Sequence, residues 1–362
     1  MPTVFPPPPL LKRAKFFLKL LWMHHFVNFY LFVRRLYRFG YYKDAPTFTL
    51  TVPQHRLSSY WVPSTVEVYL PQSYPASTSS STVPVSSSKR YPLFFTIHGG
   101  GFNVGHPVLD AEFNRYISDA ASCVVVALAY RKTPYSRWPV PVKDLTALVV
   151  ELLKDERISH IYDPSKVAIG GFSAGGNLST ALSIQPELQG KIQTIVPFYP
   201  VLDFTMTTQE KLALRPKNAP PDVLRNMGDF FSFGYVPPGT DRENPSLSPF
   251  FAKAEDLPEN IYLVGCEYDM LNIDSRKFYE KFGKVKKNFV FDEVKDVRHG
   301  FTHQSVERMN PKAHEKLSKI TFELYDRVAA WLTDLWGSEK KEVDAPIEER
   351  RDGELGDDIV IL

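Results

Sequence analysis

The sequence Gly-Phe-Ser-Ala-Gly at residues 171–175 follows a short apolar run, residues 166–169, and precedes a helix-like run that begins at Gly176. A serine hydroxyl becomes an effective nucleophile only when its oxygen is exposed and a base takes its proton. Glycines on both sides of the serine allow the sharp strand-to-helix turn that exposes it. The amide N–H of Ala174 would then face a developing oxyanion at a helix N-terminus. We predict that Ser173 is a nucleophile; a glycine-rich turn with a serine N-cap is the alternative.

A second glycine motif, His-Gly-Gly-Gly-Phe at residues 98–102, directly follows the apolar run 93–97. Successive glycines carry no side chains to shield their N–H groups, so they can form an anion-binding concavity. In α/β hydrolases a loop at this place, after a strand upstream of the nucleophile, completes the oxyanion hole. A phosphate-binding loop is the competing interpretation, but the motif lacks the lysine and the glycine spacing of such loops.

Taken together, the two glycine motifs resemble the hormone-sensitive-lipase-like family of α/β hydrolases. The resemblance covers about residues 90–305, and the serine motif continues with Gly176 and Asn177 as in that family. The segment between the motifs is also similar to the family's, through Tyr130, Arg131, Pro134, Trp138, Pro139 and Asp144. The resemblance implies a carboxylesterase in which Gly100, Gly101 and Ala174 supply the oxyanion N–H groups. One departure is Phe172, because the family often has an acidic residue before the nucleophile.

The catalytic base is expected after the nucleophile, because α/β hydrolases place their triad in the order serine, acid, histidine. His299 begins a His-Gly-Phe element at residues 299–301 that is similar to the family's, and we predict that it is the base. The later histidines, His303 and His314, lie in polar helical or pre-helical surroundings and are predicted to be surface residues.

The predicted acid is Asp269, which follows the apolar run 261–264. A carboxylate at the carboxyl end of a strand lies in the layer where it can hold an imidazole tautomer. Asp-Met-Leu at residues 269–271 also fits the family's Asp-x-Leu element. Three other acids could take this role: Asp274, Glu267 and Asp296. Asp274 fits a helix cap, and Asp296 is expected to pair with Lys295 or Arg298.

The surrounding pattern predicts an α/β-hydrolase fold with a mostly parallel, twisted sheet and helices on both faces, because short apolar runs alternate with helix-like segments. The predicted parallel strands are 93–97, 122–129, 166–169, 192–197, 261–264 and 288–291, and the predicted helices are 110–120, 140–154, 174–184, 272–282 and 311–335. Residues 47–52 and 60–70 predict two antiparallel strands. Residues 203–250 break the alternation and predict a cap insertion, and residues 73–88 predict a serine-rich surface loop.

Composition limits the function classes. The chain has 362 residues, 43% of them hydrophobic, and a net charge of +2 from 43 basic and 41 acidic residues. Such a balance excludes a generally basic nucleic-acid binder. Two cysteines, Cys123 and Cys266, make no disulfide framework, and no Cys/His cluster suggests zinc. We expect neither a metal nor a cofactor.

The two ends of the chain differ from the middle, so we expect three parts: residues 1–45, a hydrolase domain at 46–336, and an acidic tail at 337–362 that extends into solvent. Residues 1–45 carry eight basic side chains and one acid, and 14 of the 18 residues in 16–33 are apolar. Such a segment is typical of a membrane anchor or a surface-lying helix, and the alternative is a buried cap helix over the active site. Because no small-residue cleavage site follows it, secretion is not supported and an intracellular, membrane-associated protein is expected.

These features predict a serine carboxylester hydrolase that cleaves short- or medium-chain esters, or hydrophobic metabolite esters, through an acyl-enzyme. The expected partner is a small-molecule ester. One alternative is a non-catalytic small-molecule receptor on the same fold. Receptors of this family have lost a triad residue, whereas Ser173, Asp269 and His299 are all present here. The other alternative is an amidase or acyltransferase that uses the same triad.

Overall fold

The centre of the protein is one eight-stranded sheet. The computed structural model describes residues 3–37, 44–52, 64–75, 89–303 and 311–337. The strand order is β1-β2-β4-β3-β5-β6-β7-β8. The strands are β1 (Phe48–Val52), β2 (Ser64–Tyr69), β3 (Tyr91–Ile97), β4 (Val124–Leu128), β5 (Tyr162–Phe172), β6 (Thr194–Phe198), β7 (Asn260–Cys266) and β8 (Asn288–Val294). β1 and β2 pair antiparallel at one edge, and every pair from β4 to β8 is parallel. The predicted mostly parallel sheet is confirmed.

Burial along the strands explains why the sequence forms this sheet. Every residue of β3, β4 and β6 is buried, as expected for central strands covered by helices on both faces. β1 instead alternates between exposed and buried positions, because it lies at the edge and has one face toward water. The uninterrupted apolar runs and the alternating run therefore distinguish central from edge strands.

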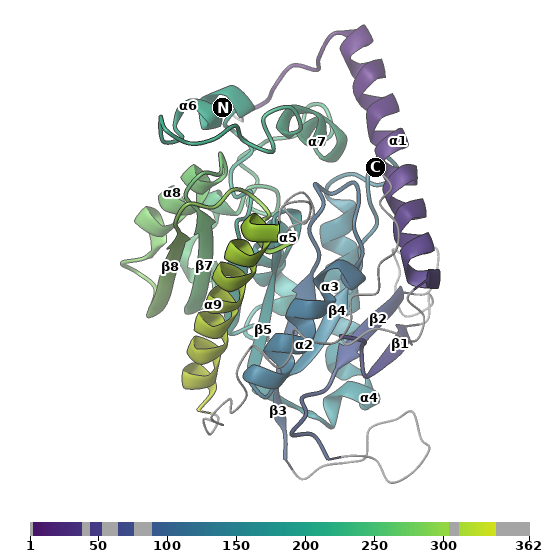
Figure 1. Ribbon diagram of the computed structural model, residues 1–362, viewed down its shortest axis with the longest axis vertical. Coiled ribbons are helices and arrows are strands. Elements are labelled where there is room, and N and C mark those ends of the chain that lie inside the picture. The colour runs from purple at the N-terminus through teal and green to yellow at the C-terminus, as the bar shows by residue number, and fades with distance from the viewer. Residues whose placement is uncertain (1–2, 38–43, 53–63, 76–88, 304–310, 338–362) are drawn as a thin grey trace.

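Helices cover both faces of the sheet (Figure 1). The covering helices are α2 (Ala111–Ala120), α3 (Val140–Lys154), α4 (Glu156–Ser159), α5 (Ala174–Ser183), α8 (Asn272–Phe282) and α9 (Pro311–Trp336). Leu145 of α3, Leu178 of α5 and Phe278 of α8 are buried in one hydrophobic cluster. Phe113 of α2 and Leu324 of α9 are buried in a second cluster on the opposite face. The five helices that the sequence predicts are all present.

The predicted cap insertion contains two short helices. They are α6 (Thr208–Ala213) and α7 (Gly228–Tyr235), followed by the 3-10 turn η4 (Pro249–Phe251). Further 3-10 turns are η2 (Pro107–Asp110), η3 (Pro186–Leu188), η5 (Ala254–Asp256) and η6 (Phe301–His303). Figure 1 shows α6 and α7 together at one end of the molecule, beside the start of the chain.

The N-terminal segment forms one long helix, α1 (Leu10–Tyr37), along one flank of the molecule (Figure 1). It packs against α7. By length and composition, Leu10–Val33 is long and apolar enough to cross a membrane, and only 11% of its most apolar window is buried. One side of α1 is thus packed on the protein and most of the helix surface is exposed. The interpretations of the segment as a membrane anchor, a surface-lying helix and a cap helix all stay predictions. Most of the predicted serine-rich loop, residues 76–88, and the acidic tail, residues 338–362, lie outside the described residues.

Two of the motif glycines lie where the backbone of β3 meets the turn at residues 171–175, here called the nucleophile turn after the predicted role of Ser173. A Cβ atom on Gly171 or on Gly175 would overlap the carbonyl oxygen of Ile97, the last residue of β3. Because the obstacle is buried backbone, a side chain at either place forces the strand and the turn apart.

We therefore expect Gly175→Ala to lower the free energy of unfolding by about 3 kcal/mol or more, because a methyl group has no space there. Gly190→Ala is the control. Gly190, unlike Gly175, has a positive φ, but no atom lies within 4 Å of its added Cβ, so its cost is limited to about 1–2 kcal/mol of backbone strain. Urea unfolding of both variants measures the difference, and equal losses would contradict the packing argument.

Candidate active site

Ser173 lies at the junction between β5 and α5. Its backbone has φ 54° and ψ −112°, a conformation that costs a residue with a side chain some strain. The neighbouring strand holds the turn, because the Ser173 N–H donates to the Phe198 carbonyl at 2.8 Å. The sharp turn leaves the residue partly exposed although both flanking residues are buried.

The structure brings the predicted serine, histidine and aspartate together. The Ser173 hydroxyl and His299 Nε2 lie 2.8 Å apart. His299 Nδ1 lies 2.6 Å from Asp269 Oδ2. The aspartate side chain is fully buried and the histidine side chain is 8% exposed. In this arrangement the Nδ1–H donates to the carboxylate, which leaves Nε2 as the acceptor for the serine proton.

Neighbouring backbone contacts hold the acid and the base in place. Asp269 lies just beyond β7, and its second carboxylate oxygen accepts the Leu271 N–H at 2.9 Å. The Tyr268 N–H donates to the Val297 carbonyl at 3.0 Å, which joins the loop of the acid to the loop that carries His299. Both side chains therefore approach the serine from loops that are tied to each other.

The three rival acids have other partners. Asp274 is buried near the start of α8 and accepts the N–H groups of Leu202 and Asp203. Glu267 accepts the N–H of Asp296. The Asp296 carboxylate accepts the Tyr268 hydroxyl at 2.7 Å. Of its two predicted partners, Lys295 or Arg298, Lys295 lies against the carboxylates of Glu293 and Glu267.

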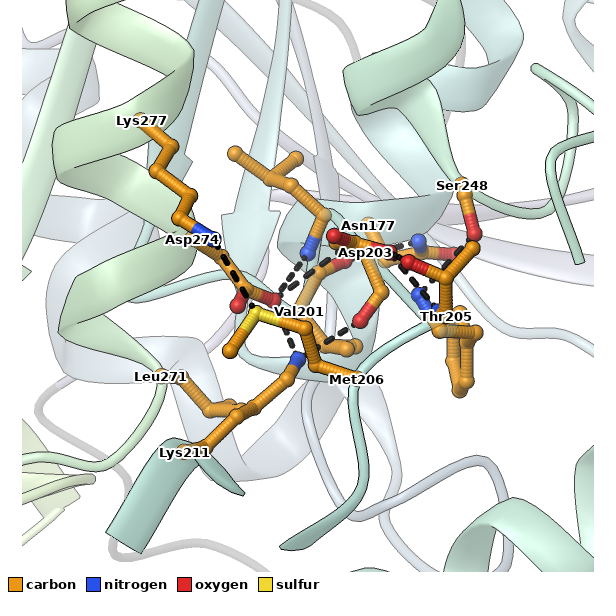
Figure 2. A network of polar contacts seen from close by, with 12 residues as sticks. Asn177, Val201, Asp203, Thr205, Met206, Lys211, Ser248, Leu271, Asp274 and Lys277 are labelled. Carbon is orange, nitrogen blue, oxygen red and sulfur yellow. Dashed lines mark hydrogen bonds and ion pairs between the residues drawn. The ribbon is translucent and has the colours of Figure 1, made fainter. Parts of the chain in front are cut away.

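A buried polar network links the cap insertion to helices α5 and α8 of the hydrolase domain (Figure 2). Lys211 of α6 donates to Asp274 Oδ2 and to the Asp203 carbonyl, each at 2.6 Å. Burial raises the pKa of Asp274, and the nearby ammonium of Lys211 opposes this rise. Asn177 of α5 donates to the carbonyls of Val201 and Leu247. The segment that follows β6 is thus held by α5, α6 and α8 together.

His303, which the sequence predicts to be a surface residue, is partly exposed, with a side chain that is 29% accessible, and it also has partners inside the protein. Its Nε2 lies 2.8 Å from Asp110 Oδ1, and its Nδ1 lies 3.0 Å from the Thr302 hydroxyl. Its ring meets the Phe172 ring edge-on at 4.9 Å. His303 therefore packs against the residue that precedes Ser173, a contact that sequence reasoning missed. The other histidine, His314, is partly buried in α9.

Phe172, the departure from the family pattern, packs inside an aromatic cluster. Its ring stacks on Phe198 at 4.5 Å and meets Phe113 edge-on at 5.1 Å. The residue is 1% exposed. An apolar contact therefore stands where the family often has a carboxylate, so the turn is supported by packing and not by charge.

The glycine loop, residues 98–102, lies directly against the nucleophile turn. A Cβ on Gly99 would come within 2.9 Å of the Phe172 carbonyl oxygen. Gly100 closes a tight turn by accepting the N–H groups of Asn103 and Val104. Its successor Gly101 has φ 59°. The predicted donors Gly100, Gly101 and Ala174 therefore come from two backbone segments in contact with each other.

A buried histidine fixes the start of this loop. His98 Nδ1 lies 2.7 Å from the Gly99 carbonyl, and its ring stacks on Tyr130 at 4.5 Å. Burial lowers the pKa of His98 well below its ordinary value, and nearby Lys132 adds to the effect. The neutral imidazole therefore donates its Nδ1–H to the carbonyl.

Among the described residues, no group of three or more His, Cys, Asp or Glu side chains could hold a metal ion. Both cysteines are buried thiols, and burial raises their pKa values.

The fold and this arrangement of side chains agree with the sequence comparisons. A sequence profile of the alpha/beta hydrolase fold matches residues 94–303. The chain belongs to the α/β-hydrolase family. The match confirms the resemblance drawn from the two glycine motifs, and it covers both motifs together with Asp269 and His299.

Three similar proteins illustrate the relationship. An AB hydrolase superfamily protein of Schizosaccharomyces pombe is 27% identical over 203 residues, or 54% of this chain and 59% of that protein. Arylacetamide deacetylase-like 2 of Homo sapiens is 26% identical over 272 residues, covering 59% of this chain and 67% of that protein. An esterase structure from Pyrobaculum calidifontis has a TM-score of 0.67 at 20% identity, covering 91% of this chain and 99% of the other. The match thus spans less than two thirds of the yeast relative, and the esterase structure shows a shared fold.

The environment of His98 predicts a loss of stability in mild acid. The pKa of His98 is lowered in the folded state. Below about pH 6.5 this histidine is therefore protonated in the unfolded chain but stays neutral in the folded chain. The free energy of unfolding should therefore fall as the pH drops, by up to about 1.4 kcal/mol per pH unit from this group. Urea unfolding between pH 7 and pH 5 measures the slope. In His98→Asn, which keeps an N–H donor but does not titrate, the slope should be smaller; an unchanged slope would contradict this assignment.

Proposed function

We propose that the protein is a serine carboxylester hydrolase with Ser173 as nucleophile, His299 as general base and acid, and Asp269 as the residue that orients His299. The observation that carries the proposal is the position of one imidazole between a hydroxyl at 2.8 Å and a buried carboxylate at 2.6 Å. This geometry is the one that nucleophilic catalysis by serine requires.

The reaction would proceed in two halves. Ser173 Oγ attacks the ester carbonyl carbon while its proton moves to His299 Nε2. The carbonyl oxygen becomes an oxyanion, which the N–H groups of Gly100, Gly101 and Ala174 stabilise. When the tetrahedral intermediate collapses, the carbon–oxygen bond to the alcohol breaks and His299 gives the alcohol its proton. Water then attacks the acyl-enzyme by the same steps and releases the carboxylic acid.

The names of the similar proteins support acyl hydrolysis. The human relative is named for an arylacetamide deacetylase, and the Pyrobaculum protein is an esterase. An amide substrate would use the same residues, with an amine as the leaving group.

The cap favours a hydrophobic substrate. A cavity of about 410 Å³ lies between the start of the chain and the cap insertion. Apolar side chains from both parts and from the loop after β7 line much of it, among them Phe16, Phe204, Phe233, Val236, Met270 and Leu271. The last two directly follow the proposed acid Asp269 in the chain, whereas no triad residue and no proposed oxyanion residue lines the cavity itself. We infer that it receives the apolar part of an ester.

Three single substitutions test the triad. In Ser173→Ala, His299→Ala and Asp269→Asn, hydrolysis of p-nitrophenyl acetate and butyrate should fall by about 10⁴–10⁶ in kcat, because the attacking oxygen, its base or the base's tautomer is lost. The melting temperature should remain close to that of the wild type.

Two of the three substitutions, Ser173→Ala and Asp269→Asn, have matched controls. Ser179→Ala removes a serine of the same helix, α5, whose hydroxyl bonds to the Gly176 carbonyl. Asp296→Asn changes an acid on the histidine loop whose partner is Tyr268. Both controls should keep activity within about tenfold. Full activity in Ser173→Ala would show that the nucleophile is another residue, and a folded but inert wild type would favour the receptor alternative.

A further substitution tests how the cap affects the preference of the protein for the acyl-chain length of its substrate. The Phe231 ring of α7 fills the space where a Cβ of Gly101 would lie, so it covers the proposed oxyanion loop. Phe231→Ala should raise kcat/KM for p-nitrophenyl octanoate relative to acetate by about tenfold. The reason is that contacts with a few additional methylene groups change kcat/KM by about this factor. Phe251→Ala in η4 is the control, because its ring lies against Phe250. An unchanged ratio in Phe231→Ala would contradict this role.

A further inference from the structure

Helix α1 has two faces with different surroundings. The side chains that face the protein repeat at helical spacing, from Phe16 through Leu20 and His24 to Leu31. Leu20 and Leu31 are 1% and 4% exposed. The Phe16 ring lies 5.5 Å from the Phe233 ring of α7. One stripe of α1 is therefore packed against the hydrolase domain.

Polar contacts fix the same stripe. His24 Nδ1 lies 2.8 Å from the Asn103 carbonyl oxygen. The Asn103 side-chain amide in turn donates to the Leu20 carbonyl at 3.2 Å. The next residue is His25, whose Nε2 lies 2.7 Å from the Tyr135 hydroxyl. The histidines that would be costly in the middle of a membrane thus have partners in the protein.

Both ends of the segment are tied to the domain, which excludes a membrane-spanning position for α1 in this arrangement. Before the helix, the Thr3 carbonyl accepts the Arg242 N–H at 3.0 Å, and the Arg242 guanidinium lies 4.1 Å from the centre of the Phe5 ring. Near its other end Leu31 is buried. A helix of 28 residues is about 42 Å long, so spanning a bilayer would carry one end away from these partners.

The opposite face of α1 is apolar and exposed. Trp22, Phe26 and Phe29 are 63%, 54% and 66% exposed, and the Trp22 and Phe26 rings stack at 5.0 Å. Further exposed apolar side chains on the helix are Leu10, Leu11, Phe17, Leu18, Tyr30 and Phe32. Contiguous exposed apolar surface of this kind marks a site of association with a partner or a membrane.

The charge of α1 selects between these partners. The helix contains no acidic residue, and its sequence has Lys12, Arg13, Lys15 and Lys19 in the first half and Arg34 and Arg35 near the end. In a two-fold dimer through this face the basic ends would meet each other, because the same surface occurs on both copies. An anionic lipid surface complements the same charges, and aromatic side chains favour the level of the headgroups.

We propose that the outer face of α1 lies on an anionic lipid bilayer, with the helix parallel to the membrane plane and the hydrolase domain held against the surface. Trp22, Phe26 and Phe29 enter the headgroup region, and Lys15, which is exposed in the first half of the helix, contacts lipid phosphates. The inner stripe stays packed on α7. This proposal does not depend on the hydrolytic activity.

Vesicle sedimentation with the full-length chain tests the surface. The wild type should sediment with vesicles of phosphatidylcholine and phosphatidylglycerol, and less with phosphatidylcholine alone. Trp22→Ser/Phe29→Ser should bind the anionic vesicles at least about tenfold more weakly, because two exposed aromatic side chains no longer enter the interface. Leu214→Ser/Val285→Ser removes two apolar side chains of similar exposure, 55% and 60%, away from α1, and should bind like the wild type.

A sidedness measurement tests the orientation. An epitope fused before Met1 should be digested by external protease in sealed membrane vesicles, because both ends of α1 lie on the same side as the domain. A protected epitope would show that α1 spans the bilayer and would overturn the proposal. Equal vesicle binding by wild type and Trp22→Ser/Phe29→Ser, or no binding by the wild type, would also overturn it. Unchanged melting temperatures would show that the variants are folded.

Discussion

The structure depends on one close contact between two backbone segments. The carbonyl of Ile97, at the end of β3, lies where side chains on Gly171 and Gly175 would stand. Only glycines let β3 and the turn of Ser173 approach so closely, and this approach brings the loop of Gly100 and Gly101 beside the serine. The hydrogen bond from Ser173 N–H to Phe198 then holds the turn from the other side. The two glycine motifs, separated by about seventy residues, are thus one structural unit.

The sequence predicted the parts of the fold and site that depend on local patterns. Apolar runs without alternation indicated buried parallel strands, because helices cover both faces of such a sheet. The motifs placed Ser173, Asp269 and His299 each at the end of a strand or in the following loop. Carboxyl ends of parallel strands meet at one edge of a sheet, so the structure could bring the three side chains together.

Features that depend on distant partners could not be predicted in the same way. His303 lies among polar residues in the sequence, yet its ring contacts Phe172 and its Nε2 faces Asp110, which are far away along the chain. The expected partner of Asp296 was a neighbour in sequence, whereas the fold supplies the Tyr268 hydroxyl. A local pattern shows which residues are polar, but the hydrogen-bond partner of each polar group depends on which distant segments the fold brings together.

The same limit applies to α1, and here it changes the physical interpretation. Hydropathy counts residues along the helix, and by that measure Leu10–Val33 is long and apolar enough to span a bilayer. The polar residues of the segment are scattered in sequence, so they define no polar face by themselves. In the fold His24 meets the backbone of Asn103 and His25 meets Tyr135, so the protein satisfies those groups while Trp22, Phe26 and Phe29 stay outside. An amphipathic helix is usually polar toward water and apolar toward the protein. In α1 the outward stripe is instead rich in aromatic side chains, and the helix has no acid to balance its basic residues. A surface of that kind binds most favourably where apolar and anionic groups lie next to each other, as they do at the interface of an anionic lipid bilayer.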